Sequence, residues 1–168
     1  MIGNDVVDIS QSRLESNWQR SGFTQKIFTD DEQRCITNTN DPETLIWLLW
    51  SMKEAAYKIY NRQTGIRKYI PKKLECTILF KGNTYCIGQV ICFDNLYYTK
   101  TVITNDSLHT IAVTKLSDFS NVVETDKKLI LKNEFGLPYI FDGSKNKHQE
   151  VSVSNHGRFE KTVALRMI

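Results

Sequence analysis

Residues 41–65 restrict the possible folds of this chain more than any other segment. Asp41-Pro42 has the form of an N-cap followed by proline at the first helical position, and Gly65 lies just beyond the expected helix end near Asn61. When this segment is placed on a helical wheel at about 100° per residue, one side becomes continuously apolar. That side consists of Leu45, Leu48, Leu49, Met52, Ala55, Ala56 and Ile59. The segment therefore predicts a long helix packed on a hydrophobic core.

The opposite side of this helix combines two tryptophans with charged residues. It consists of Trp47, Trp50, Ser51, Glu54, Lys58 and Asn61. A fully solvated helix face rarely presents two tryptophans, so we expect the helix to be covered on both sides, with Glu54 and Lys58 emerging from a partly buried wall. Buried charges persist when they are paired, or when they hold an ion or a charged ligand. The spacing alone allows either a binding wall or an ordinary i,i+4 ion pair worth about 0.2–0.5 kcal/mol.

Strand-forming residues dominate the second half of the chain. Runs rich in Ile, Val, Tyr, Phe and Thr predict strands at Leu74–Phe80, Thr84–Phe93, Tyr97–Thr104, Leu108–Lys115, Leu129–Lys132, Glu150–Ser154 and Thr162–Met167, besides a short strand at residues 2–9. Asp94-Asn95 resembles a tight hairpin turn between two of these runs. A capping box at Thr29–Glu32 predicts the start of a short helix that ends near Ile36. Helices mostly precede strands, so we expect an α+β fold in which a long helix packs on a mainly antiparallel sheet.

Length and composition are those of one ordinary globular domain. The 168 residues include 40% hydrophobic and 24% charged residues, which argues against a disordered chain and favours a single domain over residues 1–168. The net charge of +3 is small for a strong nucleic-acid binder. The longest apolar stretch, Leu45–Trp50, is far shorter than the roughly 18 residues of a membrane span, and no basic leader is present. The four cysteines form no C-x-x-C pair, so we expect reduced thiols in the cytoplasm rather than disulfides or a zinc site.

The charged string in the long helix belongs to a recognisable motif. Trp50-Ser51-Met52-Lys53-Glu54-Ala55-Ala56-Tyr57-Lys58 resembles the W/F-x-x-K-E-A-x-x-K motif of the 4′-phosphopantetheinyl transferases. Gly3-Asn4-Asp5 resembles the G-x-D motif of that family. Gly136-Leu137-Pro138 resembles its G-K-P, and Ser152-Val153-Ser154-Asn155-His156-Gly157-Arg158-Phe159 resembles its S-x-S-H-S-G-x-W segment. Thr29–Glu32 and Thr64–Ile66 resemble two weaker motifs, and the order of all these matches is that of the short holo-acyl-carrier-protein synthases.

The resemblance implies a fold, a reaction and a set of site residues. The expected reaction moves 4′-phosphopantetheine from coenzyme A to a serine of an acyl or peptidyl carrier protein and requires Mg²⁺. Asp5 and Glu54 are expected to bind the metal, and Glu54 and Lys58 to act in catalysis. The residues expected to bind the cofactor are Lys53, Lys58, Gly65, Ser154, Asn155 and Arg158. Because the short synthases are trimers with active sites between subunits, a homo-oligomer, including a trimer, is also implied.

Several of these residues have ordinary structural alternatives. Asp5 could bond a backbone amide at the end of its strand, and Ser154 could cap local backbone. Arg158 could simply be exposed, and Gly65 could serve as the helix C-cap. Asp8 fits a structural or supporting role better than a catalytic one.

Three positions depart from the family pattern. The histidine of S-x-S-H falls on Asn155, with His156 one position later, and an asparagine carries no charge. Leu137 replaces the lysine of G-K-P, and Val7 stands where the larger, two-lobed members carry a second acid. These departures motivate an alternative function, that of a catalytically impaired module of the same fold that binds coenzyme A or a nucleotide.

The run Arg67–Lys73 is basic and contains a tyrosine. It allows three interpretations: a solvated loop, a docking patch for an acidic carrier protein, or a contact to a nucleic-acid backbone. The modest net charge favours the carrier patch over nucleic acid, and we expect neither a nucleic-acid nor a membrane partner.

Overall fold

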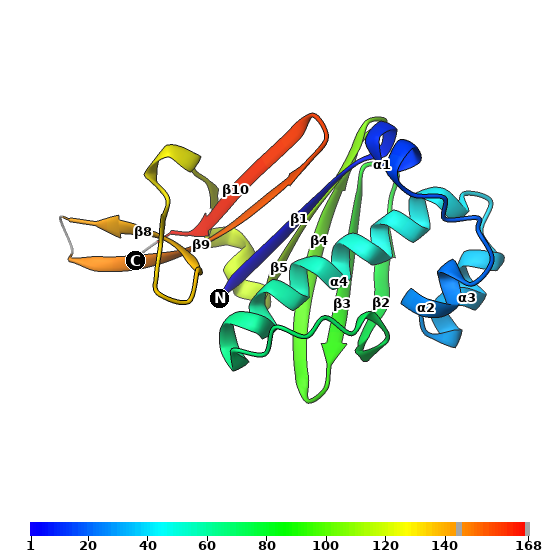
Figure 1. Ribbon diagram of the computed structural model, residues 1–168, viewed down its shortest axis with the longest axis horizontal. Helices are drawn as coiled ribbons and strands as arrows, with labels where there is room; N and C mark the ends of the chain where they lie inside the picture. Colours follow the sequence, from blue (N-terminus) through cyan, green and yellow to red (C-terminus); the bar gives the residue numbers. More distant parts are fainter. Residues whose placement is uncertain (144–145, 167–168) are drawn as a thin grey trace.

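The fold consists of one long helix and two antiparallel sheets (Figure 1). The computed structural model describes residues 1–143 and 146–166. The first sheet has the strand order β1 (Ile2–Asp8), β5 (Ser107–Val113), β4 (Asn95–Ile103), β3 (Tyr85–Cys92), β2 (Leu74–Lys81). The second has the order β6 (Val122–Glu124), β10 (Phe159–Leu165), β9 (Lys147–His156), β8 (Pro138–Asp142), β7 (Leu131–Lys132). The predicted α+β class with a long helix on an antiparallel sheet is therefore confirmed.

Helix α4 (Pro42–Thr64) lies across the first sheet and forms the centre of the main core (Figure 1). The Asp41 side chain caps its N-terminus by accepting from the Thr44 N–H at 3.1 Å, and Gly65 caps its C-terminus with φ 72°. The helix thus runs about one turn beyond the predicted end, to the predicted glycine. Trp47 is buried although it lies opposite the apolar stripe, so the expected cover on both sides is confirmed.

Three short helices precede α4 in the chain: α1 (Ile9–Glu15), α2 (Phe23–Ile27) and α3 (Asp30–Thr37). The capping box at the start of α3 is present, with Thr29 and Glu32 bonding each other's backbone N–H groups. Helices α1 and α2 were not predicted, because five to seven residues offer too little apolar periodicity.

The strand predictions are mostly confirmed, with three corrections. Of the predicted strand Leu129–Lys132 only Leu131–Lys132 forms a strand, because Leu129 ends a short 3-10 helix, Lys127–Leu129. The β3–β4 hairpin turns at Phe93-Asp94 rather than at Asp94-Asn95, since Asn95 pairs with Cys92 and Phe93 takes the positive φ of 53°. Strands β6 and β8 were not predicted. The predicted last strand is β10, and its expected end, Met167, lies outside the described residues.

The two sheets meet along a seam of side-chain-to-backbone hydrogen bonds. Strand β1 is the edge of the first sheet and runs beside β9 and β10 of the second (Figure 1). Its N–H groups at Asn4, Val6 and Asp8 donate to Ser152 Oγ, Ser154 Oγ and His156 Nδ1 at 2.8, 3.0 and 2.9 Å. Alternate residues of β9 therefore satisfy alternate backbone donors of β1, as the two-residue period of strands requires.

Two general expectations can also be compared with the structure. All four cysteines are free thiols in the structure. None of the helices that the structure describes is long and apolar enough to cross a membrane.

Candidate active site

A close crossing of β1 over α4 brings the G-x-D motif to the long helix. A Cβ atom built on Gly3 would overlap the backbone oxygen of Ala55, so only glycine permits this separation. Asp5 follows two residues later and, because strand side chains alternate, lies on the same face as Gly3. The glycine of the motif thus serves to bring the aspartate against α4.

We expect Gly3→Ala to lower the free energy of unfolding by about 1–3 kcal/mol, the usual cost of overpacking a tight contact. Urea unfolding monitored by circular dichroism measures this loss. Gly143→Ala is the matched control, because among the described residues a Cβ there meets only Phe141 Cε1, at 3.9 Å. Equal unfolding midpoints for Gly3→Ala and the wild type would contradict the close crossing.

Asp5 presents a buried carboxylate with one oxygen engaged and the other free. Only 9% of the residue is exposed. Its Oδ1 accepts from Ser154 Oγ at 3.1 Å and lies 4.0 Å from Lys58 Nζ. Its Oδ2 is buried without a hydrogen-bond partner among the described residues. Burial raises the pKa of Asp5, and the charge of Lys58, followed by the Ser51 and Ser154 hydroxyls, partly opposes this rise.

Glu54 faces Asp5 from α4 and shares its partly buried environment. Burial, and secondarily the charge of Asp5, raise the pKa of Glu54 from 4.5 to about 7. Lys58 and the Tyr69 hydroxyl oppose this rise. The Tyr69 ring packs edge-on against Trp50 and Tyr57, with ring centroids 5.9 and 4.9 Å away. Aromatic rings therefore shield Glu54 from water on one side.

Lys58 joins both sheets to the helix. Its Nζ donates to the Asn4 carbonyl at 2.6 Å and to the Val153 carbonyl at 3.1 Å, in addition to its approach to Asp5. Its side chain is 32% exposed. Burial lowers the pKa of Lys58, while Asp5 and Glu54 oppose that change. The ammonium group thus lies near Asp5, and two of its three donors are committed to backbone carbonyls.

Asp5 and Glu54 line the same small cavity of about 270 Å³. Its other lining residues are Val6, Val7, Ser12, Glu15, Ser16, Trp47, Trp50, Asn155 and His156. Two further hollows, of about 180 and 240 Å³, follow along α4 toward its C-terminus. They share Asn61, Arg62 and Leu137, and the last one reaches Gly65 and Arg67.

The paired acids fit a hard divalent cation. Within residues 1–143 and 146–166, no group of three or more His, Cys, Asp or Glu side chains is placed to hold a metal. Two carboxylates are nevertheless what Mg²⁺ takes from a protein when water and substrate oxygens complete its shell. The unpartnered Oδ2 of Asp5 is an additional indication, because a buried carboxylate oxygen without a donor is unfavourable unless a cation or proton approaches it.

Lys53 does not lie at this site, contrary to the prediction that it binds the cofactor. The residue has 0% exposure. Its Nζ forms an ion pair with Glu32 at 2.8 Å and donates to the carbonyls of Pro71, at 2.9 Å, and Leu74. All three ammonium donors are thus used inside the core, so we assign Lys53 a structural role.

Arg158 is likewise engaged by a structural partner. Its Nε and Nη2 bind the two oxygens of Asp8 at 2.9 and 3.0 Å. Asp8 also caps α1 by accepting from the N–H groups of Ser10 and Gln11. Hydrogen bonds from Arg158 hold the pKa of Asp8 well below its usual range. The structural role expected for Asp8 agrees with this geometry, which offers no support for Arg158 as a phosphate contact.

The other residues predicted to bind the cofactor, Gly65, Asn155 and Ser154, lie in different parts of the structure. Gly65 lies at the far hollow, and Asn155 is exposed on the wall of the cavity that contains the acids. Ser154 is buried against Asp5 instead of facing that cavity. His156, which the sequence left without a role, lines the cavity and pairs its Nε2 with Glu15 at 3.1 Å. In the sequence, the two-residue spacing of Ser152, Ser154 and His156 was the signal that these three side chains share one face of a strand.

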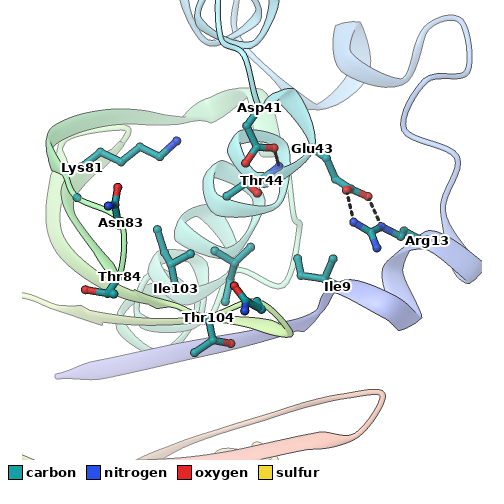
Figure 2. Close-up of a pocket in the computed structure, with 13 residues that line it drawn as sticks. Ile9, Arg13, Asp41, Glu43, Thr44, Lys81, Asn83, Thr84, Ile103 and Thr104 are labelled. Carbon is teal, nitrogen blue, oxygen red and sulfur yellow. Dashed lines mark hydrogen bonds and ion pairs between the residues drawn. The ribbon is translucent and has the colours of Figure 1, made fainter.

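A larger cavity, of about 810 Å³, opens elsewhere, at the N-terminal end of α4 (Figure 2). Its charged groups are largely satisfied, because Arg13 forms an ion pair with Glu43 at 2.7 Å and Asp41 caps the helix. It contains neither Asp5 nor Glu54. Size alone therefore does not identify the active site, and the paired acids favour the smaller cavity.

Comparison with known proteins identifies the family of this chain. The family model of the 4′-phosphopantetheinyl transferase superfamily matches residues 1–112. That range holds the whole of α4 and both acids. The match and the fold together define the class of protein as a phosphopantetheinyl transferase. The chain belongs to the 4′-phosphopantetheinyl transferase superfamily. A search of curated proteins gave no significant match.

Proposed function

We propose that this protein transfers 4′-phosphopantetheine from coenzyme A to a serine of an acyl or peptidyl carrier protein, as holo-acyl-carrier-protein synthases do, with Mg²⁺ as its metal. The observation that supports this most is the pairing of Asp5 and Glu54 in one cavity, with Asp5 Oδ2 unpartnered and Lys58 beside them. Phosphoryl transfer needs mainly positioning and charge neutralisation, and these groups provide both.

In the proposed reaction the serine hydroxyl attacks the β-phosphorus of coenzyme A. A new O–P bond forms, the bond to adenosine 3′,5′-bisphosphate breaks, and the serine proton leaves directly or through water to Glu54. A carboxylate in this cavity is a suitable acceptor for that proton. Lys58 offsets negative charge on the diphosphate. Asp5 and Glu54 would hold the Mg²⁺, which supplies further neutralisation of the phosphate oxygens.

The hollows along α4 support an elongated cofactor. They extend from Lys58, past Asn61 and Arg62, to Gly65 and Arg67. We place the remainder of coenzyme A along this side of the helix, with Gly65 permitting close approach of the ligand and Asn155 at the other end, near the acids.

The basic run Arg67–Lys73 borders the proposed site. Arg67, Lys68, Lys72 and Lys73 are exposed, whereas Tyr69 packs inward against Trp50. A row of exposed cations next to the reaction site favours docking of an acidic carrier protein, because complementary charge accelerates encounter. A fatty-acid, polyketide or peptide carrier fits this description equally well.

Three further expectations from the sequence stay proposals. A homo-oligomer is supported by exposed apolar side chains on the outer face of the first sheet, namely Leu79, Ile91, Leu96 and Val102. A cytoplasmic location is consistent with the free thiols. The impaired module that binds coenzyme A without turnover rests on Asn155 and Leu137. Within residues 1–143 and 146–166, no structural feature favours nucleic-acid binding over the carrier patch.

We expect incubation with an apo carrier protein, coenzyme A and Mg²⁺ to add the mass of phosphopantetheine to the carrier, measured by intact-protein mass spectrometry. EDTA should abolish the mass shift, and Asp5→Asn should reduce its rate by at least about 100-fold, because one metal ligand is lost. If several carriers stay unmodified while calorimetry shows coenzyme A binding, the impaired module is the correct function. If Asn155→His then restored transfer, the asparagine at position 155 would be the cause of the missing turnover.

A further inference from the structure

Ser154 contacts one of the two acids from the opposite sheet. It lies on β9, outside the residues that the family model matches, and is 6% exposed. Its Oγ donates to Asp5 Oδ1 at 3.1 Å and accepts from the Val6 N–H at 3.0 Å. The single O–H donor of Ser154 is thus committed to Asp5, which leaves the hydroxyl poorly placed to donate to a phosphate.

Ser152 shows what the same residue does without an acid nearby. It lies two residues earlier on the same face of β9, and its Oγ accepts from the Asn4 N–H at 2.8 Å. No hydrogen bond from Ser152 to a carboxylate is found in the described part of the chain. Both serines therefore connect the sheets equally, and the contact with Asp5 distinguishes Ser154.

The contact determines how Asp5 presents its oxygens. Ser154 engages Oδ1, on the side where Lys58 also approaches, and Oδ2 is left buried and unpartnered. A carboxylate held through one oxygen by a fixed donor has its plane and its free oxygen oriented before any ligand arrives. Partners of this kind orient metal-binding side chains and strongly affect affinity.

We propose that Ser154 is a positioning residue that orients the Asp5 carboxylate toward the cation, so that the second sheet completes the metal site of the first. This inference rests on the proposed function, because it takes Asp5 as a metal ligand. It replaces the expectation that Ser154 binds phosphates of the cofactor.

The test measures Mn²⁺ affinity of the apoprotein by electron paramagnetic resonance of free Mn²⁺, and coenzyme A affinity in EDTA by calorimetry. Ser154→Ala should weaken Mn²⁺ binding by about 10–100-fold and leave metal-free coenzyme A binding unchanged. Ser154→Thr, which retains the hydroxyl, should recover most of that loss. Ser152→Ala is the matched control: it also leaves one β1 amide without its acceptor, yet it should change Mn²⁺ affinity by less than about twofold.

Each other outcome has a defined meaning. Equal losses of Mn²⁺ affinity in Ser154→Ala and Ser152→Ala would overturn the inference, because both serines would then act only by joining the two sheets. Loss of metal-free coenzyme A binding in Ser154→Ala would make it a cofactor contact. A wild-type protein that binds no Mn²⁺ would overturn the inference together with the metal site. Normal metal binding with the expected mutant pattern, but without transfer to any carrier, would overturn only the proposed function.

Discussion

Glu54→Gln is expected to abolish transfer and, at the same time, to stabilise the folded protein above pH 7. The loss of activity should be about 10²–10⁴-fold, because the substitution removes both a proton acceptor and a metal ligand. The gain in stability has a separate cause. The wild-type folded state must keep a carboxylate ionised in a partly buried position beside Asp5, and the amide has no charge to bury.

The pH dependence of this gain follows from the raised pKa of Glu54, which changes from 4.5 to about 7 on folding. Between these values the folded state binds more protons than the unfolded state, so the stability of the wild type falls as pH rises. At 1.36 kcal/mol per pKa unit the effect is at most about 3 kcal/mol, and solvent screening of the partly exposed carboxyl reduces it. The advantage of Glu54→Gln should thus be small at pH 5 and largest at pH 8.

Urea unfolding in EDTA at pH 5 and pH 8 measures this difference, and the mass-spectrometric assay measures transfer. Glu75→Gln on β2 is a suitable control, because Glu75 is exposed and its substitution should not change the pH dependence. A stability difference between Glu54→Gln and the wild type that is independent of pH would show that the glutamate is not held in a desolvated position. Retained transfer would exclude Glu54 from the reaction.

Lys53→Met is expected to cause a large loss of stability without a specific loss of cofactor binding. The substitution leaves the Glu32 carboxylate charged and 3% exposed, without its cationic partner. Breaking a buried ion pair in this way costs about 3–5 kcal/mol. Glu32 also accepts from the N–H groups of Thr29 and Cys76, both at 2.8 Å, so α3, α4 and β2 all meet at this pair.

The double variant Lys53→Met/Glu32→Gln shows why Lys53→Met loses stability: because the Glu32 charge is left unpaired, or because side-chain packing is lost. Because both charges are removed, it should recover a substantial part of the stability lost in Lys53→Met. Urea unfolding and coenzyme A calorimetry on the folded fraction are the measurements. Near-wild-type stability of Lys53→Met combined with lost coenzyme A affinity would restore the cofactor role that the sequence suggested.

The two lysines of the K-E-A-x-x-K string illustrate the limit of sequence-based prediction. Helical spacing places Glu54 and Lys58 on one side of α4 with the two tryptophans, and the structure keeps them together. The same spacing puts Lys53 about 100° from Glu54, which is compatible with either the cavity or the core. In the folded protein Lys53 lies in the core because it forms an ion pair with Glu32 of α3. A helical wheel of α4 contains no information about residues of another helix.

The sequence by itself determined the elements that depend on neighbouring residues: α4 with its Asp41 and Gly65 caps, the capping box of α3, and the alternating strands of the first sheet. Tertiary structure alone decided which side chains meet, because those contacts join residues far apart in the chain. The approach of Asp5 to Glu54 depends on the Gly3 crossing, and the attachment of Ser154 to Asp5 depends on how the second sheet docks against β1. Local periodicity fixes the direction of a side chain relative to its own element, whereas its partner depends on the packing of all the elements together.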